Sequence, residues 1–383
     1  MSRTLIVTND FPPRAGGIQA FVHQLAVRQP VGSIVVYAPA WDGAAEFDAE
    51  QPFEVVRHPT SLMLPVPDVA RRATEIAHVE GCTTVWFGAA APLGLLAPTL
   101  RRAGVERFVA QTHGHETGWA MLPGARGMLR RIARGVDIVT YLGPYTRSKL
   151  AAVMGSRTEL VRLPPGVDTE AFHPGLDGSA VREAYGLTDR RVVVCVSRLV
   201  PRKGQDQLIR ALPAIRRRVP GAALLLVGSG PDESRLRRLV DHRGLRDHVC
   251  FTGELEWSDI PHHFAAGDVF AMPCRTRKGG LDVEGLGIVY LEASATGLPV
   301  VAGDSGGAPD AVRPGGTGYV VPGRDVAVIA DRVATLLEDE RLAGAMGAAG
   351  RAWVEREWRW STLAARMTQL LSPGHPAGIS DGS

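Results

Sequence analysis

Two glutamates eight residues apart, Glu284 and Glu292, give the strongest indication of chemistry in this 383-residue sequence. They bracket a glycine-rich turn, Gly285-Leu286-Gly287, whose backbone amides can meet an anion or sugar hydroxyls as the chain enters a helical pattern. On a helix, eight residues rise about 12 Å, comparable to the distance from a sugar across a diphosphate to a ribose. Glu292 stands in an otherwise apolar stretch, which indicates a specific partner. The structural alternative makes Glu284 a helix-dipole partner and Glu292 a solvated residue.

A basic loop, Ser197-Arg-Leu-Val-Pro-Arg-Lys-Gly204, follows an apolar strand pattern. Within it, Arg198 offers a bidentate fork and Lys203 a compact point charge, a combination that suits a diphosphate. Only three of the 43 basic residues are lysines, so a lysine here favours function over a solvated turn.

A glycine pair, Gly16-Gly17, stands where the first strand pattern gives way to a helical one. Backbone amides at such a helix start can approach an anion. The alternative is a helix entry that needs a positive φ angle, which glycine tolerates. The residues alone leave both open.

Short β-branched runs that alternate with helical patterns must position these groups. In the first half the strand patterns are 5–8, 33–37, 54–57, 84–87, 108–111 and 138–141. In the second half they are 192–196, 223–227, 249–251, 269–272, 300–302 and 318–321. Several are continuous apolar runs, as in a parallel sheet covered on both faces. Two such series predict an α/β protein with two doubly wound sheets.

The length of the chain favours two domains over one core. We place the boundary in the turn-rich stretch 163–168, which gives a domain over 1–165 and a second over 166–355. The helical pattern that follows ends at 371, and the Pro/Gly/Ser-rich tail 372–383 is expected to be disordered. Because ligands bind at the carboxyl ends of strands in such sheets, we expect the site in a cleft between the lobes.

Composition excludes several classes of protein. A charged fraction of 22% and the lack of an apolar run of ~18 residues exclude a disordered chain and a membrane-embedded one. The beginning of the chain turns polar too quickly for a signal peptide, so we expect a cytosolic protein. Basic arrays interleaved with aromatics are missing, which argues against nucleic acid. The sequence contains no D-x-D and its four cysteines are isolated, so we expect no metal.

The positive charge is unevenly distributed. Residues 1–165 hold 17 Lys+Arg and 13 Asp+Glu, a net +4, whereas the remainder holds 26 and 27, a net −1. One helical pattern carries a basic face of the kind that suits anionic lipid headgroups, at about 1 kcal/mol per contact. Its basic residues are Arg126, Arg130, Arg131 and Arg134. The alternative is an ordinary solvated helix.

Several of these motifs together resemble retaining glycosyltransferases of family 4, which have the GT-B fold. They are the Gly-Gly-Ile helix entry, His113 after a strand, the S-R-L-x-x-x-K-G loop and the E-x7-E pair. The resemblance covers nearly the whole chain, with the motifs in the right order. It implies two Rossmann-like domains facing across a cleft, and a C-terminal helix, 356–371, that packs back on the N-terminal domain.

Four longer segments are similar to members of this family that transfer mannose from GDP-mannose to the inositol 6-position of phosphatidylinositol monomannoside. The segments are 7–14, 86–93, 111–116 and 280–293. The resemblance implies GDP-mannose and a lipid acceptor as partners, no cofactor, and a cytoplasmic enzyme held peripherally on the inner face of the cell membrane. It also favours a lipid-facing role for the basic helical face.

The resemblance implies a role for each donor-side residue. Arg198 and Lys203 would bind the diphosphate. Glu284 would hold mannose hydroxyls, with backbone contacts from Gly285 and Leu286. Glu292 would hold the ribose.

Further roles follow for an aromatic residue and for the N-terminal half. Trp257 is a candidate to flank the guanine, with surface packing as its alternative. Gly16 and Gly17 would meet the donor phosphate, and Asp10 and Gln19 would face the inositol end of the acceptor.

Transfer that retains the anomeric configuration by way of an enzyme nucleophile needs a carboxylate near the anomeric carbon. The sequence offers no evident residue for this nucleophile. The family resemblance instead favours front-face attack, in which the leaving phosphate receives the acceptor proton. Arg198 and Lys203 would stabilise the developing charge. His113, preferred to His115, would lie near the reacting carbon and position or stabilise it.

Two alternatives remain open from the sequence. One is a glycosyltransferase of the same fold with another nucleotide-sugar donor or a soluble acceptor. The other is a non-catalytic nucleotide-sugar sensor, against which the intact set of candidate catalytic and donor-binding residues argues. That set is His113, Arg198, Lys203, Glu284 and Glu292, the first four being the catalytic candidates.

Overall fold

The computed structural model describes residues 3–155 and 158–372 and divides into two compact units. The first comprises the described residues of Met1–Gly166 and Trp360–Ser383, and the second is Val167–Arg359. Of the tail expected to be disordered, residues 373–383 lie outside the described part. Ser372 directly follows the last helix, its amide donating to the carbonyl of Thr368 at 3.2 Å.

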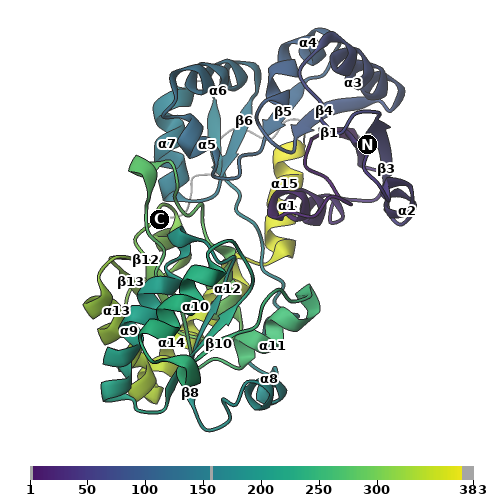
Figure 1. Cartoon of the computed structure of the whole chain (residues 1–383). Helices are drawn as coiled ribbons and strands as arrows, with labels where there is room; N and C mark the ends of the chain where they lie inside the picture. Colours follow the sequence, from purple (N-terminus) through teal and green to yellow (C-terminus); the bar gives the residue numbers. More distant parts are fainter. Residues whose placement is uncertain (1–2, 156–157, 373–383) are drawn as a thin grey trace. The chain divides into compact units, whose positions relative to one another are not determined.

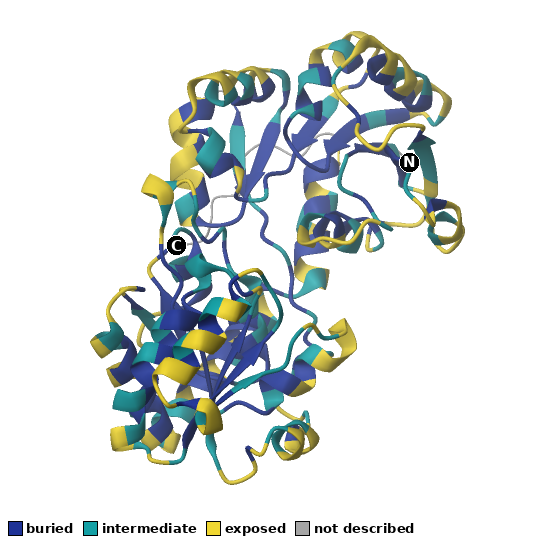
Figure 2. Ribbon diagram, in the orientation of Figure 1, coloured by how far each residue is buried: buried dark blue, intermediate teal, exposed yellow. Residues whose placement is uncertain are grey.

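The first unit is built on a seven-stranded sheet of order β3-β2-β1-β4-β5-β6-β7, in which every pairing is parallel (Figure 1). Its strands are β1 (Arg3–Val7), β2 (Ile34–Pro39), β3 (Glu54–His58), β4 (Cys82–Phe87), β5 (Arg107–Ala110), β6 (Ile138–Tyr141) and β7 (Glu159–Arg162). Strands β2 and β6 are buried along their whole length and β1 at all but its first residue, whereas the edge strand β3 is only partly covered (Figure 2). Six of these strands were predicted from apolar runs. The seventh, β7, was missed because only Val161 is buried in this short edge strand.

Helices cover both faces of this sheet. They are α1 (Gly17–Ala26), α2 (Ala44–Ala49), α3 (Pro67–Val79), η1 (Leu93–Leu96), α4 (Ala97–Arg102), α5 (Glu116–Trp119), α6 (Pro123–Gly135) and α7 (Pro144–Met154). Right-handed crossovers put connections that run in opposite directions along the sheet on opposite faces. Helices α3, α4, α6 and α7 pack in series on one face, and α1 lies on the other. Without a further element, β4 and β5 would leave apolar surface uncovered on the α1 face.

The last helix, α15 (Trp360–Leu371), supplies that cover. It packs against α1, β4 and β5 (Figure 1). Two side chains of the sheet hold its end: the Thr84 hydroxyl donates to the carbonyl of Leu371 at 3.0 Å, and Arg107 Nε donates to that of Leu370 at 2.6 Å. The C-terminal helix therefore packs on the N-terminal unit as the family resemblance implied. It begins at Trp360, four residues after the expected start.

The second unit holds a six-stranded parallel sheet of order β10-β9-β8-β11-β12-β13. Its strands are β8 (Arg191–Val196), β9 (Ala222–Val227), β10 (Val249–Phe251), β11 (Val269–Met272), β12 (Val300–Gly303) and β13 (Gly318–Val321). Each lies within one residue of its predicted position. They are nearly continuous apolar runs because both faces are covered.

The helices of the second unit form two layers. They are α8 (Ser179–Ala184), η2 (Pro201–Lys203), α9 (Gln205–Arg218), α10 (Glu233–His242), η3 (Arg246–His248), η4 (Trp257–Asp259), α11 (Ile260–Ala265), η5 (Lys278–Gly280), α12 (Ile288–Ala295), η6 (Ala308–Ala311), α13 (Val326–Glu338) and α14 (Glu340–Glu357). Helices α9, α10 and α13 pack together, as do α12 and α14. Helix α13 was not predicted, although Asp325 caps it by accepting from the amides of Ala327 and Val328.

The chain passes between the units twice, and the two passages lie side by side. In the first unit, a Cβ atom on Gly166 would come within 2.8 Å of the Trp360 backbone, so only glycine fits there. In the second unit, the Val167 amide donates to the carbonyl of Trp358 at 2.7 Å. This close pairing fixes both crossings near the turn-rich stretch where we placed the domain boundary.

Within residues 3–155 and 158–372, no helix combines the length and the apolar character needed to cross a bilayer.

Met367 tests how far the first unit depends on α15, because its side chain is fully buried. Met367→Ala should lower the free energy of unfolding by about 2–5 kcal/mol, since it removes buried methylene groups and leaves a cavity. Urea denaturation of the full chain measures this change. The matched control on the same helix is the exposed Gln369→Ala, expected to lie within about 0.5 kcal/mol of wild type. Equal effects of the two variants would contradict the packing role of α15.

Candidate active site

The structure brings Lys203 and Glu284 into direct contact, although 80 residues separate them. Lys203 Nζ lies 2.7 Å from Glu284 Oε2, and both side chains are largely buried. Strands β8 and β11 are neighbours in the sheet, so the loops that follow them meet at its carboxyl edge. An ammonium carries three hydrogens, so the bond to Glu284 leaves two for a bound anion. Lysine and glutamate can thus serve adjacent parts of one ligand.

The turn that carries Lys203 is fixed by its neighbours. Gly204 has a left-handed backbone (φ 83°), and a Cβ there would lie 2.1 Å from the Pro273 carbonyl oxygen. Gln205, which opens α9, donates from Nε2 to the Ser197 hydroxyl at 2.9 Å and to the Arg198 carbonyl at 3.2 Å. The loop therefore closes on itself and holds Lys203 over the end of β8.

A buried ion pair ties this loop to the one after β11. Arg275 forms a two-pronged bond to Asp206 at 2.8 and 3.1 Å, and its amide donates to the carbonyl of Arg202. Fork-to-fork geometry of this kind adds directional precision to the charge interaction. It fixes the spacing between the two loops on which the Lys203–Glu284 contact depends.

Arg198 is exposed at the end of β8, on the same loop as Lys203. Its backbone is held by the following loop: a Cβ on Gly230 would lie 2.4 Å from the carbonyl oxygen of Leu199, and the Leu199 amide donates to Ser229. The backbone at the strand end is thus fixed, and the exposed Arg198 side chain is available to an anion.

Glu284 rests on a turn that the sequence analysis did not single out. Its carbonyl accepts from the Gly307 amide at 2.9 Å, and a Cβ on Gly306 would lie 2.1 Å from the same oxygen. The Gly306-Gly307 pair after β12 gave the only signal. This close backbone approach sets the direction of the turn at Gly285 and Leu286.

Arg202 and Asp282 also belong to this cluster and were assigned no role from the sequence. Arg202 Nε lies 3.3 Å from Asp282 Oδ1, and its Nη1 lies 3.5 Å from Glu284 Oε2. Glu284 is therefore flanked by two cations. Both added residues lie in the motifs already identified, but no spacing rule indicated that their side chains would meet.

Glu284 and Glu292 do not lie on one continuous helix. Helix α12 begins only at Ile288, so Glu284 to Gly287 precede it and the 12 Å helical span is wrong. The Glu292 side chain is partly buried, and burial raises the pKa of this carboxyl to about 7. An ion pair for it is lacking among the described residues. A group with so high a pKa suits hydrogen bonding to a neutral hydroxyl.

Trp257 opens η4, after β10, and its side chain is 60% exposed. One edge meets the ring of the buried Phe172, with centroids 6.2 Å apart at 85°. The exposed face leaves both earlier interpretations, base stacking and surface packing, possible on geometric grounds.

In the first unit, Asp10 and Gln19 are joined, Gln19 Nε2 donating to Asp10 Oδ1 at 2.9 Å. The Gln19 side chain folds back over Gly16, where a Cβ would lie 2.1 Å from its Oε1. Gly16 itself is extended (φ 161°), so the positive-φ alternative is wrong. Gly17 opens α1 and is exposed, with open space where a Cβ would stand.

His113 follows β5, and its Nε2 lies 2.6 Å from the Gly88 carbonyl oxygen after β4. Because a carbonyl only accepts, Nε2 carries the proton. Burial lowers the pKa of His113, and the nearby carboxylate of Glu116 only partly opposes this shift. The ring is therefore neutral near pH 7, and its Nδ1 is a hydrogen-bond acceptor. Such a ring can orient a hydroxyl group.

Glu116 is a buried carboxylate that the sequence analysis did not assign. It accepts from the His113 amide at 3.0 Å and lies 3.5 Å from the Nε2 of His115. Only 1% of the residue is exposed, and its carboxylate is engaged by these neighbours. It positions His113, whereas His115 is exposed on the outer side.

The four arginines on the basic helical pattern lie on α6, whose buried face holds Leu129 and Ile132. Arg130, Arg131 and Arg134 are exposed. Arg126 differs, because it is partly buried and donates to the carbonyl of Ala152 at 3.4 Å. None of the four contributes to the clusters around Lys203 or His113.

Across the described ranges, no group of three His, Cys, Asp or Glu side chains gathers as a metal site. Metal independence stays a prediction.

Comparison with known proteins defines the class. Residues 15–171 match the family described as Glycosyltransferase Family 4, and residues 179–353 match Glycosyl transferases group 1. Anabaena HepE, solved in complex with UDP, shares the fold with a TM-score of 0.80 at 20% identity, over 96% of this chain and 99% of that one. The glycosyltransferase WaaG gives 0.66 at 17% identity, over 97% and 100% of the two chains. The chain belongs to glycosyltransferase family 4 and has the GT-B fold.

Relatives with higher sequence identity are named for one activity, mannosyl transfer from GDP-mannose. The GDP-mannose-dependent alpha-(1-6)-phosphatidylinositol monomannoside mannosyltransferase of Mycolicibacterium smegmatis is 56% identical over 96% of this chain and 98% of its own. A Corynebacterium glutamicum mannosyltransferase, which acts on a monoacylated form of the same acceptor, is 50% identical over 96% and 97%. The family and the narrower resemblance inferred from motifs are both confirmed.

The raised pKa of Glu292 predicts a pH-dependent stability. Below about pH 4.5 the carboxyl is protonated in both the folded and the unfolded chain, so its burial does not lower the free energy of unfolding through ionisation. As pH rises to 7 and above, the folded protein must ionise a buried group, at up to about 3 kcal/mol. Glu292→Gln should therefore stabilise the protein at pH 8 relative to wild type by up to that amount, and much less at pH 4.5.

Urea denaturation at the two pH values measures this difference. Glu170→Gln, a change at an exposed glutamate of the same unit, is the matched control. A stability difference for Glu292→Gln that does not change with pH would contradict the burial argument.

Proposed function

We propose that this protein is a retaining mannosyltransferase that transfers mannose from GDP-mannose to the inositol 6-position of phosphatidylinositol monomannoside. The observation that carries the proposal is 56% identity, over nearly the whole length of both chains, to an enzyme named for that reaction. The Lys203–Glu284 contact supports it, because it places a cation for a diphosphate beside a carboxylate for sugar hydroxyls.

On the donor side, Arg198 and Lys203 bind the diphosphate of GDP-mannose and offset charge on the departing nucleotide. Glu284 accepts hydrogen bonds from mannose hydroxyls, and the backbone at Gly285 and Leu286 adds contacts. Arg202 holds Glu284 in place through its second charge contact.

The nucleoside end of the donor engages two residues. Glu292 binds the ribose, for which a carboxyl of raised pKa is suited because its partner is uncharged. Trp257 flanks the guanine with its exposed face.

In the first unit, Gly16 and Gly17 approach the donor phosphate through their amides. Asp10, fixed by its bond from Gln19, faces the inositol end of the acceptor, and Gln19 contributes from the same pair. His113 lies beside the mannose, where its Nδ1 orients a hydroxyl near the reacting carbon.

The mechanism we infer is front-face attack. The acceptor hydroxyl attacks the anomeric carbon on the side of the departing diphosphate, whose oxygen receives the acceptor proton. The carboxylate of the buried Glu116 is engaged by its neighbours, so we assign it no role as a nucleophile, and His113 stays neutral. Arg198 and Lys203 stabilise the charge that develops on the leaving group, so no step needs a metal.

The acceptor is a lipid, and we propose that the enzyme reaches it peripherally from the cytoplasmic face of the membrane. Helix α6 offers the contact surface, with Arg130, Arg131 and Arg134 exposed. Arg126 contributes less, because its side chain already contacts α7. Lysine and arginine side chains near an anionic surface are worth about 1 kcal/mol each. Nucleic acid is no partner in this proposal.

Mass spectrometry of the product tests the donor and the acceptor together. Purified protein incubated with GDP-mannose and a monomannosylated phosphatidylinositol should give the dimannoside, with little product from UDP-glucose or UDP-N-acetylglucosamine. Transfer from a uridine donor only would instead support a related glycosyltransferase. Tight donor binding without turnover would support a nucleotide-sugar sensor.

Lys203→Ala and Glu284→Ala should each lower kcat/KM at least about a hundredfold, because each removes a group that contacts the reacting donor. Circular dichroism and Tm should show a folded protein, since Arg202 still compensates Glu284 when Lys203 is lost. The matched control is Lys149→Ala, which removes an exposed lysine from the first unit. Near-normal turnover of either site variant would refute the assigned roles.

A further inference from the structure

Helix α6 carries three exposed arginines, Arg130, Arg131 and Arg134. Within the described ranges, Arg130, Arg131 and Arg134 form no ion pair with any acidic side chain. Unpaired guanidinium groups on one exposed face indicate an anionic partner from outside the chain.

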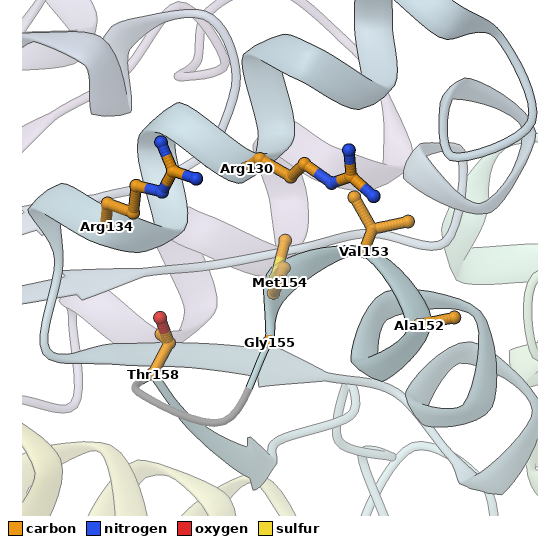
Figure 3. A pocket seen from close by; sticks show the side chains of 7 residues that line it. All are labelled: Arg130, Arg134, Ala152, Val153, Met154, Gly155 and Thr158. Carbon is orange, nitrogen blue, oxygen red and sulfur yellow. The ribbon is translucent and has the colours of Figure 1, made fainter.

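A hollow of about 560 Å³ lies beside the last turns of α6, a size typical of small-molecule sites (Figure 3). Arg130 and Arg134 line one side, and Val153, Met154 and Thr158 line the other. Arg131, on the same helix, does not line it. Of the three exposed arginines on α6, Arg130 and Arg134 therefore line the hollow and Arg131 does not.

The chemistry of the hollow suits a phosphate. Arg130 and Arg134 are four residues apart, so their side chains stand one above the other on the helix and can grip one group together. Guanidinium forks match phosphate oxygens. No acidic side chain is among the lining residues. The Thr158 hydroxyl donates to the Ala133 carbonyl at 2.7 Å, so among the described side chains that line the hollow the two arginines provide the donors.

The hollow is separate from the candidate active site. In a parallel sheet with helical crossovers, a helix starts near the carboxyl edge and ends near the amino edge. Helix α6 follows this rule between β5 and β6, so Arg134 lies toward the amino edge. His113 and Gly88 lie at the carboxyl edge. A ligand in the hollow is therefore neither the donor nor the reacting end of the acceptor.

We propose that this hollow binds the headgroup phosphate of an anionic bilayer phospholipid and anchors the first unit to the membrane. The inference rests on the proposed function, because only a lipid acceptor requires bilayer contact. At the other end of α6, Met121 and Leu122 are 50% and 48% exposed. Apolar side chains beside a basic helical face are typical of helices that lie in a membrane interface.

Flotation with vesicles tests the site through paired double variants. Arg130→Gln with Arg134→Gln removes both lining arginines. Arg131→Gln with Arg147→Gln, both exposed in the same unit and outside the hollow, removes the same charge. On vesicles of 70% phosphatidylcholine and 30% phosphatidylglycerol, the first pair should lose about 30-fold in affinity, a factor of five per arginine. The control should lose no more than about fivefold. Equal losses, or none in either, would overturn the proposal.

A soluble short-chain lipid separates a lipid site from a free-anion site. Dihexanoyl phosphatidylglycerol below its micelle concentration should bind the wild type saturably in calorimetry and fail to bind the lining variant, while the control pair keeps binding. If inorganic phosphate binds there and the lipid does not, the hollow is a free-anion site and the lipid proposal fails.

Mannose transfer by the unaltered protein in neutral detergent micelles is measured separately. Absence of transfer there would refute the proposed function, while the vesicle and calorimetric results would still decide the headgroup site. Transfer in micelles, together with equal losses of vesicle affinity in the two double variants, would support the proposed function and refute the headgroup site.

Discussion

The contact between Lys203 and Glu284 is the interaction on which the donor side of this protein depends. It joins the loops after two neighbouring strands, and removing both charges from water costs several kcal/mol that only good geometry offsets. The surrounding structure supplies that geometry. The buried Arg275–Asp206 pair sets the spacing of the loops, and close backbone approaches at glycines orient them. A cation and a carboxylate are thereby held side by side, as the proposed binding of a nucleotide sugar requires.

The first unit follows the same principle with neutral groups. The hydrogen bond from His113 to the carbonyl of Gly88 joins the ends of β5 and β4. Glu116 fixes the His113 backbone by accepting a hydrogen bond from its amide. Burial keeps the imidazole uncharged, in contrast to the charged cluster of the second unit. Helix α15 completes this unit, because the strands it covers would otherwise expose apolar surface.

Charge is handled differently on different helices. Some arginines on α9 and α10 are paired within the second unit, as in Arg218–Asp331 and Arg237–Glu233. On α6, Arg130, Arg131 and Arg134 have no acidic partner among the described residues. In the function we propose, these arginines form the surface that meets an anionic membrane.

The sequence by itself determined the two parallel sheets and the family, because apolar runs and glycine-rich motifs depend on local spacing. It also singled out Lys203 and Glu284, which the structure brings together. It missed β7, in which only Val161 is buried, and α13, which packs against α9. Only the tertiary structure decided that Lys203 pairs with Glu284, that Arg202 and Glu116 support the site, and that α12 starts too late for a helical span. It also showed that Arg130 and Arg134, but not Arg131, line a hollow. These facts depend on which strand ends and helix ends meet, and that is set by packing across the whole unit.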